Sequence, residues 1–507
     1  MKRIAGLVIL LTIFSKILGF SRELILAYYY GASHISDAYL ISLTISGTIV
    51  AFIGVGLTTN FIPMYTKIME IDGAQKAKSF MNNVVNFTLI VSTLIVILTI
   101  GFTEQIVKVF AVGFEGETLD LAVSYTRISI MGIYFYCLYY VFSGFLNMKK
   151  KFLLPVLTTL PFNITIILSI LLSTVYGTKI LALGFVLAVI FQVLFLVPSL
   201  IKEKYKYSFV LDYKSDNLRT MIYLSLPVIL GTSVNQINVL IDRTIASSIV
   251  VGGISALNYS SRLNHFILGI FVMSIATVVF PTFSKLAVEK DFKGLKKSLK
   301  EVIIVIALII IPATIGTMIF SKPIVEVLFG RGAFDLHAMS LTSSALFFYS
   351  IGLIGFGLRE VLARVFYSLQ DTKTPMINAA IGMVLNIILN ITLSKYLGIS
   401  GLALATSLAA ITTAMLMFFS LRKRIGHFGM KSLLNTFIKI SISAFIMGAT
   451  AKFIFSYLTV ISSQTIALFL SIVIGLIVYL IILYFMKIDE VGLIVKVVTA
   501  KLNLRRN

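Results

Sequence analysis

Three cations lie inside stretches of the sequence that are otherwise apolar: Lys16, Arg22 and Arg262. Glu23 and Asp37 are the acids nearest to the first two along the chain. An isolated charge at bilayer depth costs about 2.5–3.5 kcal/mol on insertion scales, so such residues mark substrate or ion pathways. Arg suits a phosphate because its planar fork donates paired hydrogen bonds, and Lys adds a point charge. The cations therefore predict a site for an anionic ligand.

Helical periodicity places these charges on polar faces. Residues three or four apart share one face of a helix, and polar residues recur at that spacing in the apolar stretches near 4–30, 219–248 and 254–284. Polar faces inside a membrane need one another or a shared cavity. We expect Arg22 and Arg262 to be solvated cavity cations whose removal leaves no buried acid unpaired. The predicted substrate-binding set is Lys16, Arg22, Glu23, Asp37, Asn235, Asp242, Asn258, Arg262 and His265.

Some polar residues in the apolar stretches have an equally good structural explanation. Glu360 and Arg364 stand at i and i+4, the favoured orientation for an ion pair within a helix. An asparagine stripe at 378, 386 and 390 is typical of interhelical hydrogen bonding in membranes. His265 alone is more typical of a hydrogen-bonded core histidine than of a ligand-binding group.

Signatures of catalysis are missing from the sequence. No GxxxxGK[ST] motif occurs, and the four histidines and single cysteine make no metal-ligand spacing. The outer loops are short apart from about 322–338, which leaves little room for an extramembrane catalytic domain. We expect a transporter rather than an enzyme, with no catalytic residues, metal or cofactor. The sequence leaves open whether a coupling ion or the membrane potential supplies energy.

Composition indicates the elements that hold these residues. The chain has 507 residues, of which 58% are hydrophobic and 13% charged, and a mean hydropathy of +1.00. Apolar runs of about 20 residues predict an all-α polytopic membrane protein. The fourteen predicted transmembrane helices lie near 4–30, 35–64, 83–111, 120–147, 152–175, 179–201, 219–248, 254–284, 301–321, 339–369, 374–396, 399–421, 432–458 and 461–486.

The distribution of charge predicts the orientation of the chain. The net charge is +22, yet most of the 43 Lys and Arg residues fall in alternate connections or at the two ends. Only Lys179, Lys322, Arg331 and Lys395 fall in the other set of connections. By the positive-inside rule both termini are cytoplasmic. The basic loops are expected to face acidic lipid headgroups rather than nucleic acid.

The sequence also contains an internal repeat. The segment 22–39 aligns with 243–260, and PMYTK at 63–67 aligns with PTFSK at 281–285. A third match pairs Leu146-Asn147 with Leu369-Gln370. Two six-helix units in the same orientation form a parallel repeat, as in several transporters, with the substrate site between the halves. The predicted domains are 1–202 (first lobe), 203–218 (cytoplasmic linker), 219–424 (second lobe) and 425–507 (two extra helices and a cytoplasmic tail).

Four segments carry a resemblance to a known family. They are SKILGFSRELILAYYYGASHISDAYLIS (15–42), NFIPMYTK (60–67), ALNYSSRLNHFILGIFVMSIATVVFPTFSK (256–285) and ARVFYSLQDTKTP (363–375). They resemble the MurJ (MviN) family of bacterial lipid II flippases, within the multidrug/oligosaccharidyl-lipid/polysaccharide exporter superfamily.

The resemblance implies a V-shaped pair of lobes around a central cationic cavity, with two C-terminal helices forming a groove for a lipid tail. The family's cavity positions match Lys16 (commonly Arg), Arg22, Asp37 and Arg262, with Glu23 in place of an Asp. Many members carry an Arg pair and a Glu in the second span, whereas this chain has no charge from Ser46 to Gly56. That departure leaves a related glycan-lipid open as cargo.

The function implied is transfer of lipid II, a peptidoglycan precursor, from the inner to the outer leaflet of the bacterial cytoplasmic membrane by alternating access. Expected partners are lipid II or a related undecaprenyl-pyrophosphate glycan, membrane lipids and the cell-wall synthesis machinery. Three alternatives remain open at this stage. The first is a flippase for another undecaprenyl-linked polysaccharide precursor, and the second is a cation-coupled drug exporter, which should favour acids in the cavity. The third is a scaffold without transport.

Overall fold

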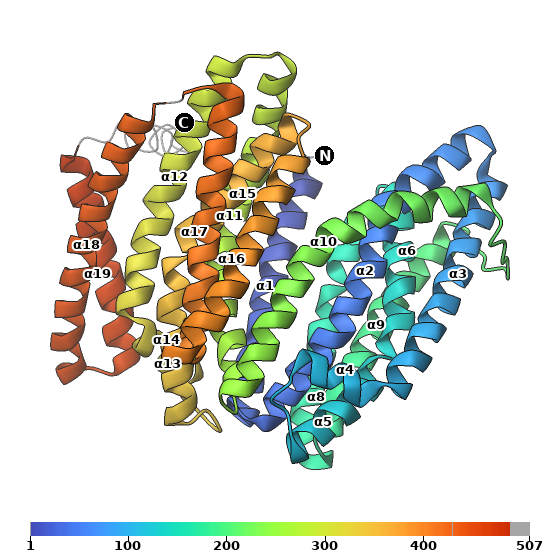
Figure 1. Ribbon diagram of the computed structural model, residues 1–507, viewed down its shortest axis with the longest axis horizontal. Helices are drawn as coiled ribbons and strands as arrows, with labels where there is room; N and C mark the ends of the chain where they lie inside the picture. The colour runs from blue at the N-terminus through green and yellow to red at the C-terminus, as the bar shows by residue number, and fades with distance from the viewer. Residues whose placement is uncertain (1, 428, 487–507) are drawn as a thin grey trace. The chain divides into compact units, whose positions relative to one another are not determined.

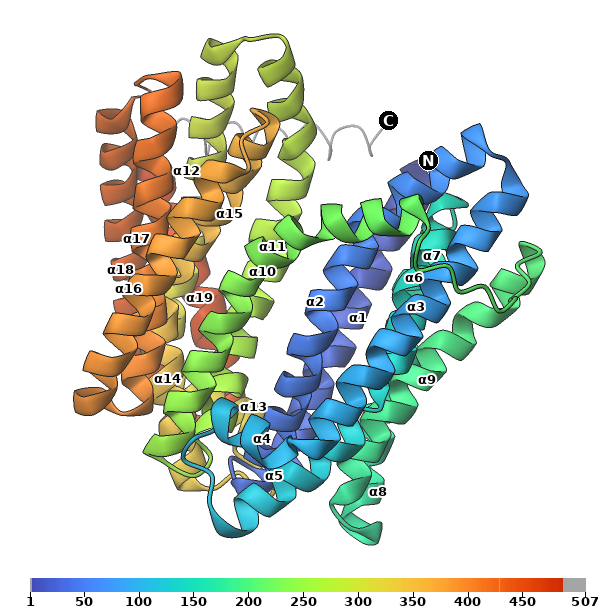
Figure 2. The same cartoon turned by 45° about the vertical axis from the view of Figure 1, so that its right-hand side comes forward.

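The computed structural model describes residues 2–427 and 429–486, and over these residues the chain forms nineteen α-helices and no β-strand. The helices fall into two compact units. The first unit runs to Ser255 and includes the loop Gly332–Asp335, while the second comprises Ala256–Arg331 and the part of the chain from Leu336 onward. Figures 1 and 2 show the helices from two directions.

The prediction of an all-α membrane protein is confirmed. Among the described residues, eleven helices are long and apolar enough to cross a membrane, and two bent helix pairs raise this number to thirteen. Helix α1 covers the range of the first predicted span, so a helix or helix pair stands at each of the fourteen predicted places. The V shape and the central cavity depend on the placement of the two units and stay predictions.

The helices of the first unit are α1 (Lys2–Tyr30), α2 (His34–Ile71), α3 (Ala74–Gly101), α4 (Thr103–Phe110), α5 (Gly116–Ser129), α6 (Gly132–Met148), α7 (Leu153–Leu157), α8 (Thr159–Tyr176), α9 (Lys179–Lys202) and α10 (Asp216–Ile249).

Helix α2 is central to the first unit and packs against α3, α5, α6 and α10. It begins with a capping box, in which the Ser33 hydroxyl accepts from the amide of Ser36 and the Ser36 hydroxyl accepts from the amide of Ser33. The core around its C-terminal half is aromatic. Phe61 stacks on Phe80 with ring centroids 6.2 Å apart, and Tyr65 meets Phe145 edge to face. Aromatic pairs of this kind add to the stability given by burial.

The predicted linker 203–218 lies against α3 rather than free. Three buried asparagines on α3 hold it: Asn82 and Asn86 accept hydrogen bonds of 2.7 Å from two linker tyrosines, and Asn83 bonds the backbone of Asp212 in both directions. Burial raises the pKa of one of these tyrosines, Tyr205, to about 12, so its hydroxyl is a protonated donor at neutral pH. The linker is therefore part of the first unit.

Helix α10, which follows the linker, bends along its length in both views (Figures 1 and 2). It contains Pro227, and a proline inside a helix removes a backbone hydrogen bond and kinks the chain. Helix α10 packs along α2, which explains why it belongs to the first unit although the repeat assigns residues 219–424 to the second lobe.

The helices of the second unit are α11 (Gly253–Val288, whose first three residues belong to the first unit), α12 (Phe292–Ile319), α13 (Ser321–Phe329), α14 (Leu336–Ile351), α15 (Leu353–Ser368), α16 (Lys373–Leu397), α17 (Ile399–Ile425), α18 (Met430–Ile461) and α19 (Gln464–Phe485).

The two extra helices, α18 and α19, form a hairpin beside α12 (Figure 1). Tyr479 on α19 donates a 2.9 Å hydrogen bond to the carbonyl of Leu308 on α12. In a helix the carbonyl of Leu308 would accept from the amide four residues later, but that residue is Pro312, which has no amide hydrogen. The Tyr479 hydroxyl satisfies this buried carbonyl instead. Close packing elsewhere in the unit depends on glycine: a Cβ on Gly355 of α15 would stand 2.6 Å from the amide nitrogen of Ile411 on α17.

The internal repeat is visible in the breaks between helices. Each unit has a short amphipathic helix after its third repeat helix (α4 and α13) and then a helix pair that bends by 41° (α5 and α6) or 46° (α14 and α15). The turns that follow are alike, with positive φ at Lys150 (60°) and Gln370 (56°). These turns align Lys150 with Gln370, so the predicted match of Leu146-Asn147 with Leu369-Gln370 is wrong by three residues.

Candidate substrate-binding site

The predicted cation Arg22 and its neighbour Glu23 form an ion pair on α1. Arg22 Nη2 donates to Glu23 Oε1 at 2.7 Å, and the side chains are 18% and 4% exposed. The guanidinium also lies within electrostatic range of the hydroxyls of Tyr39 and Tyr136. The expectation of a solvated Arg22 is therefore wrong, because the guanidinium pairs with a buried carboxylate, which also takes part in a further interaction. Helical spacing alone does not predict this pair, since residues i and i+1 point in different directions on a helix.

The other polar residues and the glycine on this side of α1, which we call the polar stripe of α1, are Ser15, Lys16 and Gly19, and some pack against α8 while Lys16 is exposed. The Ser15 hydroxyl shares a 2.6 Å hydrogen bond with Thr159 of α8, and Gly19 faces the Asn163 side chain of the same helix. Lys16 is exposed and takes part in a further interaction. Within the first unit, the stripe thus joins α1 to α8 and presents Lys16 and Arg22 at its edge.

Asp37 is buried at the start of α2 and caps the start of α11. Its carboxylate accepts from the amide of Gly252 at 2.7 Å, the amide of Ser255 at 2.8 Å and the Ser255 hydroxyl at 2.5 Å. A carboxylate at a helix N-terminus satisfies free amides and interacts favourably with the helix dipole. With 1% of its surface exposed, Asp37 holds the turn at 252 in place. Its predicted contact with substrate stays a prediction.

The second unit carries its own cationic group on α11 and α15. Arg262 and His265 are exposed on α11, and the His265 imidazole lies within electrostatic range of Arg262 and of Arg359 on α15. Asn258, one turn before Arg262, is buried. Arg359 is half-buried, and its guanidinium lies 5.5 Å from the centroid of the Phe356 ring. Sequence reasoning missed Arg359 because its neighbour Glu360 was assigned to an ion pair with Arg364.

The remaining predicted site residues lie on α10. Asp242 is half-buried and has an interaction partner. The side chain of Asn235 lies outside the described residues. Beside Asp242, Arg243 donates a 2.8 Å hydrogen bond to the carbonyl of Ile254, so this cation stabilises the turn before α11.

The residues assigned to structure make the expected contacts. Arg364 bonds Glu360 at 3.0 Å and lies 5.8 Å from the Phe280 ring centroid. The asparagine stripe joins α16 to α17, with Asn386 donating to Thr406 at 3.3 Å and Asn378 to Ser420 at 3.2 Å. The interpretation of this stripe as interhelical hydrogen bonding is confirmed for these two contacts.

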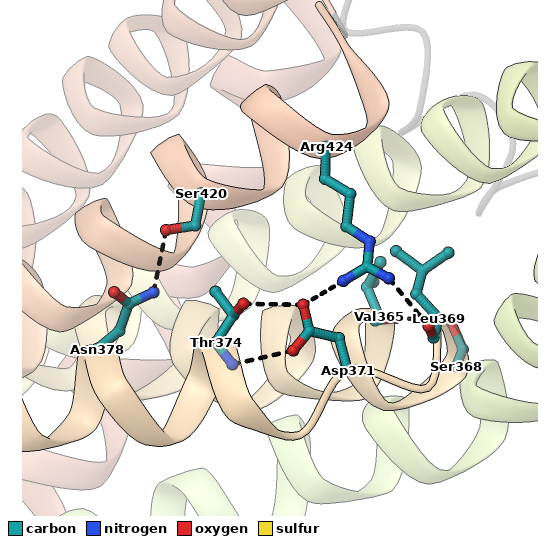
Figure 3. Close-up of polar contacts among 8 residues, drawn as sticks. All are labelled: Val365, Ser368, Leu369, Asp371, Thr374, Asn378, Ser420 and Arg424. Atoms are coloured by element: carbon teal, nitrogen blue, oxygen red, sulfur yellow. Dashed lines mark hydrogen bonds and ion pairs between the residues drawn. The ribbon is translucent and has the colours of Figure 1, made fainter.

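The motif FYSLQDTKTP forms the turn between α15 and α16 (Figure 3). Asp371 accepts hydrogen bonds from the Thr374 amide at 2.9 Å and the Thr374 hydroxyl at 2.8 Å, and it pairs with Arg424 at the end of α17. Arg424 also donates to the carbonyl of Leu369. The motif thus connects three helix ends and is not part of the cationic groups.

The arrangement of these groups suits binding rather than covalent chemistry. Across the described residues, no three His, Cys, Asp or Glu side chains come together as metal ligands. The cationic groups instead lie on α1 in the first unit and on α11 and α15, which belong to candidate membrane spans, in the second, with guanidinium groups as their main donors. Helices that repeat in two units and carry buried polar groups define a multi-pass membrane transporter.

Comparison with known proteins defines the family. Residues 26–474 match the family described as Lipid II flippase MurJ, and the chain belongs to this family. The lipid II flippase MurJ of Thermosipho africanus is 33% identical over 472 residues, which cover 93% of each chain. The probable lipid II flippase MurJ of Buchnera aphidicola subsp. Baizongia pistaciae is 31% identical over 446 residues, 86% of each chain.

Solved structures agree with this assignment. A lipid II flippase MurJ in an inward closed conformation matches with a TM-score of 0.82 and 31% identity, over 96% of this chain and 99% of that one. A multidrug resistance MATE family transporter of the MOP superfamily matches with a TM-score of 0.71 at 15% identity, over 83% of this chain and 96% of that one. The second likeness concerns the fold alone.

Proposed function

We propose that this chain moves lipid II from the inner to the outer leaflet of the bacterial cytoplasmic membrane by alternating access. The observation that carries the proposal is that each unit places arginine on a long, mainly apolar helix or helix pair: Arg22 on α1 in the first, Arg262 on α11 and Arg359 on α15 in the second. Arginine binds pyrophosphate through paired, charge-assisted hydrogen bonds. A pyrophosphate headgroup that contacts Arg22 as well as Arg262 and Arg359 would find hydrogen-bond donors in both halves of the protein.

The physical task is to lower the barrier for a charged headgroup that crosses an apolar layer. Removing a charged group from water costs many kcal/mol unless other groups replace its hydration. Arg22, Arg262 and Arg359 would supply that replacement, while the prenyl tail stays in lipid beside α18 and α19. No covalent step is needed, so the proposal includes no cofactor.

The proposed orientation has both termini in the cytoplasm, because most Lys and Arg residues of the connections fall on that side. Energy would come from a coupling ion or from the membrane potential. Partners would be membrane lipids and the enzymes that make lipid II and consume it.

A second cargo is favoured by one observation. Helix α2 carries no charge from Ser46 to Gly56, and there Val50 is buried in an apolar cluster while a Cβ on Gly54 would overlap the Tyr140 ring. This face therefore packs within the first unit instead of presenting the charges that many family members carry. A related undecaprenyl-linked glycan is the alternative cargo.

The deciding experiment follows lipid II in cells that depend on this chain alone. After rapid depletion of the protein, lipid II should become inaccessible to an externally added toxin that cleaves its headgroup. An Arg359→Gln variant should give the same result, whereas Lys395→Gln, at the end of α16, should leave cleavage normal. Unchanged cleavage after depletion would rule out lipid II and leave the related glycan-lipid as cargo.

A further inference from the structure

The second unit contains an apolar crevice of about 550 Å³ between α12, α15, α17 and α18. Its walls include Ile311 on α12, Gly355 on α15, Phe418 and Phe419 on α17 and Phe437 on α18. The hydroxyls of Thr314 and Ser441 are the only polar side-chain groups among the lining residues. Helix α19 contributes none of these residues, so the crevice is separate from the groove expected between α18 and α19.

The crevice is elongated along α17. Its lining residues on that helix run from Ile411 to Phe419, which corresponds to about 12 Å at the rise of 1.5 Å per residue. All four walls belong to membrane-spanning helices or helix pairs. A crevice with apolar walls at bilayer depth is filled by hydrocarbon rather than by water, because water needs two to four polar partners.

One end of the crevice is strongly basic. Phe418 and Phe419 are followed one turn later by Arg422 and Lys423, which continue the same face of α17 toward the end of the helix. Arg424, the next cation, is already bound by Asp371 (Figure 3). Arg422 and Lys423 therefore form a cationic rim at this end of the crevice.

Helix α12 contributes to the same rim. Lys300 lies on the α12 face that leads to Ile311 by helical spacing, through 304 and 307, and it donates a 2.9 Å hydrogen bond to Ser432 of α18. The Lys296 ammonium lies beside Gly426, just after the end of α17. Lys296 and Lys300 of α12 thus lie near the end of α17 and the start of α18.

We propose that this crevice binds an anionic phospholipid, with one acyl chain between α12, α15, α17 and α18 and the phosphate held by Arg422, Lys423 and Lys300. The charge of the rim selects a negative headgroup, because basic residues near a membrane surface each attract anionic lipid by about 1 kcal/mol. The short apolar length suits an acyl chain and leaves no room for a long polyprenyl tail. The bound lipid would fix the α18 and α19 hairpin to the rest of the second unit.

The absence of tryptophan from the chain permits a direct test. Phe437→Trp places a single fluorophore in the crevice, and Phe445→Trp, at a position 69% exposed on the same helix, is the matched control. Each variant is reconstituted in phosphatidylcholine bilayers that contain increasing amounts of phosphatidylglycerol with brominated acyl chains. We expect quenching at 437 to saturate at low mole fraction and quenching at 445 to rise in proportion to it.

The same fluorophore tests the rim. In the Phe437→Trp background, Arg422→Gln with Lys423→Gln should abolish the saturating component, whereas Lys395→Gln at the end of α16 should preserve it. Proportional quenching at both positions, or equal quenching by brominated phosphatidylcholine, would overturn the proposal. Relief of quenching by an equal amount of undecaprenyl phosphate would also overturn it, since the crevice would then belong to a polyprenyl tail.

An independent measurement avoids any change of a crevice aromatic. Native mass spectrometry of the unaltered chain, purified in mild detergent from phosphatidylglycerol-containing membranes, should detect one retained phosphatidylglycerol. Ala414→Phe fills the crevice from α17 and should release it, while Leu408→Phe, at a more exposed position of the same helix, should retain it. Equal retention by both variants would contradict the proposed site.

Discussion

Asp371, in the turn after α15, is bound by Arg424 at the end of α17 (Figure 3). In the first unit Lys151, in the equivalent turn after α6, pairs with Glu203 at the end of α9 at 2.6 Å. The two ion pairs occupy the same place in each repeat with acid and base exchanged. Because the attraction is the same whichever partner carries the positive charge, the ion pair between the turn and the end of the later helix is kept although both side chains differ.

The connection in the second unit should contribute measurably to stability. Asp371→Ala removes the acceptor for Thr374 and for Arg424, and we expect a loss of about 1–3 kcal/mol. Arg424→Gln removes one partly exposed ion pair and should cost less than about 1 kcal/mol. Thermal unfolding in detergent measures both effects, with the exposed Lys395→Gln at the end of α16 as control. An Asp371→Ala midpoint equal to that of the control would contradict this assignment.

The exchange of charges in the first unit can be tested by reversal. Lys151→Glu and Glu203→Lys should each lower the unfolding midpoint, because each places like charges together. The double variant restores opposite charges at the same two positions and should recover most of the loss, which is below about 1 kcal/mol for a partly exposed pair. Additive losses in the double variant would mean that the two residues do not interact in the membrane-embedded protein.

Asp371 should also make stability depend on pH. Burial alone would raise its pKa, but hydrogen bonds from Thr374 and the nearby Arg424 charge outweigh burial and hold the pKa below its usual range. A lowered folded-state pKa gives stability that is present above the unfolded value, near pH 4, and is lost as pH falls through the folded value. The difference in unfolding midpoint between wild type and Asp371→Asn should be constant from pH 5 to 7 and shrink below pH 4. A constant difference down to pH 3 would argue against this contribution.

Much of the fold could be predicted from the sequence, because continuous apolar runs of about 20 residues fit membrane-spanning helices and are too long for the strands of a membrane barrel. The breaks themselves were harder. The predicted span 83–111 ends at Gly101, and the residues beyond Phe102 form the amphipathic helix α4, because Glu104 and Lys108 share one face of it while Val107 and Phe110 are buried on another. The short helix α13 was predicted as part of a loop for the same reason.

The candidate site was predicted less completely. Residue types identified Arg22 and Arg262, since charges are rare and costly at bilayer depth. The hydrogen-bond partner of each charged side chain depends on how the helices pack, which residue types alone do not show. Glu23 pairs with Arg22, and Asp37 accepts from the amide of Gly252. Arg359 was overlooked because the ion pair between the next residue, Glu360, and Arg364 gave a sufficient explanation for the charges of α15.

The orientation of the chain can be tested by labelling cysteines from each side of the membrane. The single native cysteine, Cys137, is 1% exposed and should stay unlabelled, which provides an internal control. A membrane-impermeant thiol reagent added outside should react with Glu117→Cys, Leu336→Cys and Val460→Cys. It should react with Lys214→Cys, Lys297→Cys and Lys423→Cys only after the membrane is opened. Reversal at two or more positions would overturn the cytoplasmic placement of the termini.

The ion pair on α1 makes a prediction that separates folding from transport. Arg22→Ala leaves the 4% exposed Glu23 carboxylate without this partner, and removing one member of a buried pair typically costs 3–5 kcal/mol. Both the amount of protein in the membrane and the transport of lipid II should therefore fall. Arg22→Ala with Glu23→Gln removes the charge that needs a partner, so the amount of protein should recover while transport stays absent.

The recovery in the double variant is the measurement that decides between the two roles of Arg22. Membrane abundance is followed by immunoblot and transport by toxin cleavage of lipid II from outside, in cells that depend on this chain. Glu23→Gln alone is the matched control and should lose less abundance than Arg22→Ala, because the amide oxygen can still accept a hydrogen bond from the 18% exposed Arg22 guanidinium. If the double variant regained both abundance and transport, Arg22 would serve only to neutralise Glu23, and the pyrophosphate would have to be bound by the cations of the second unit. If transport stays absent at normal abundance, the guanidinium itself is needed for the headgroup to cross.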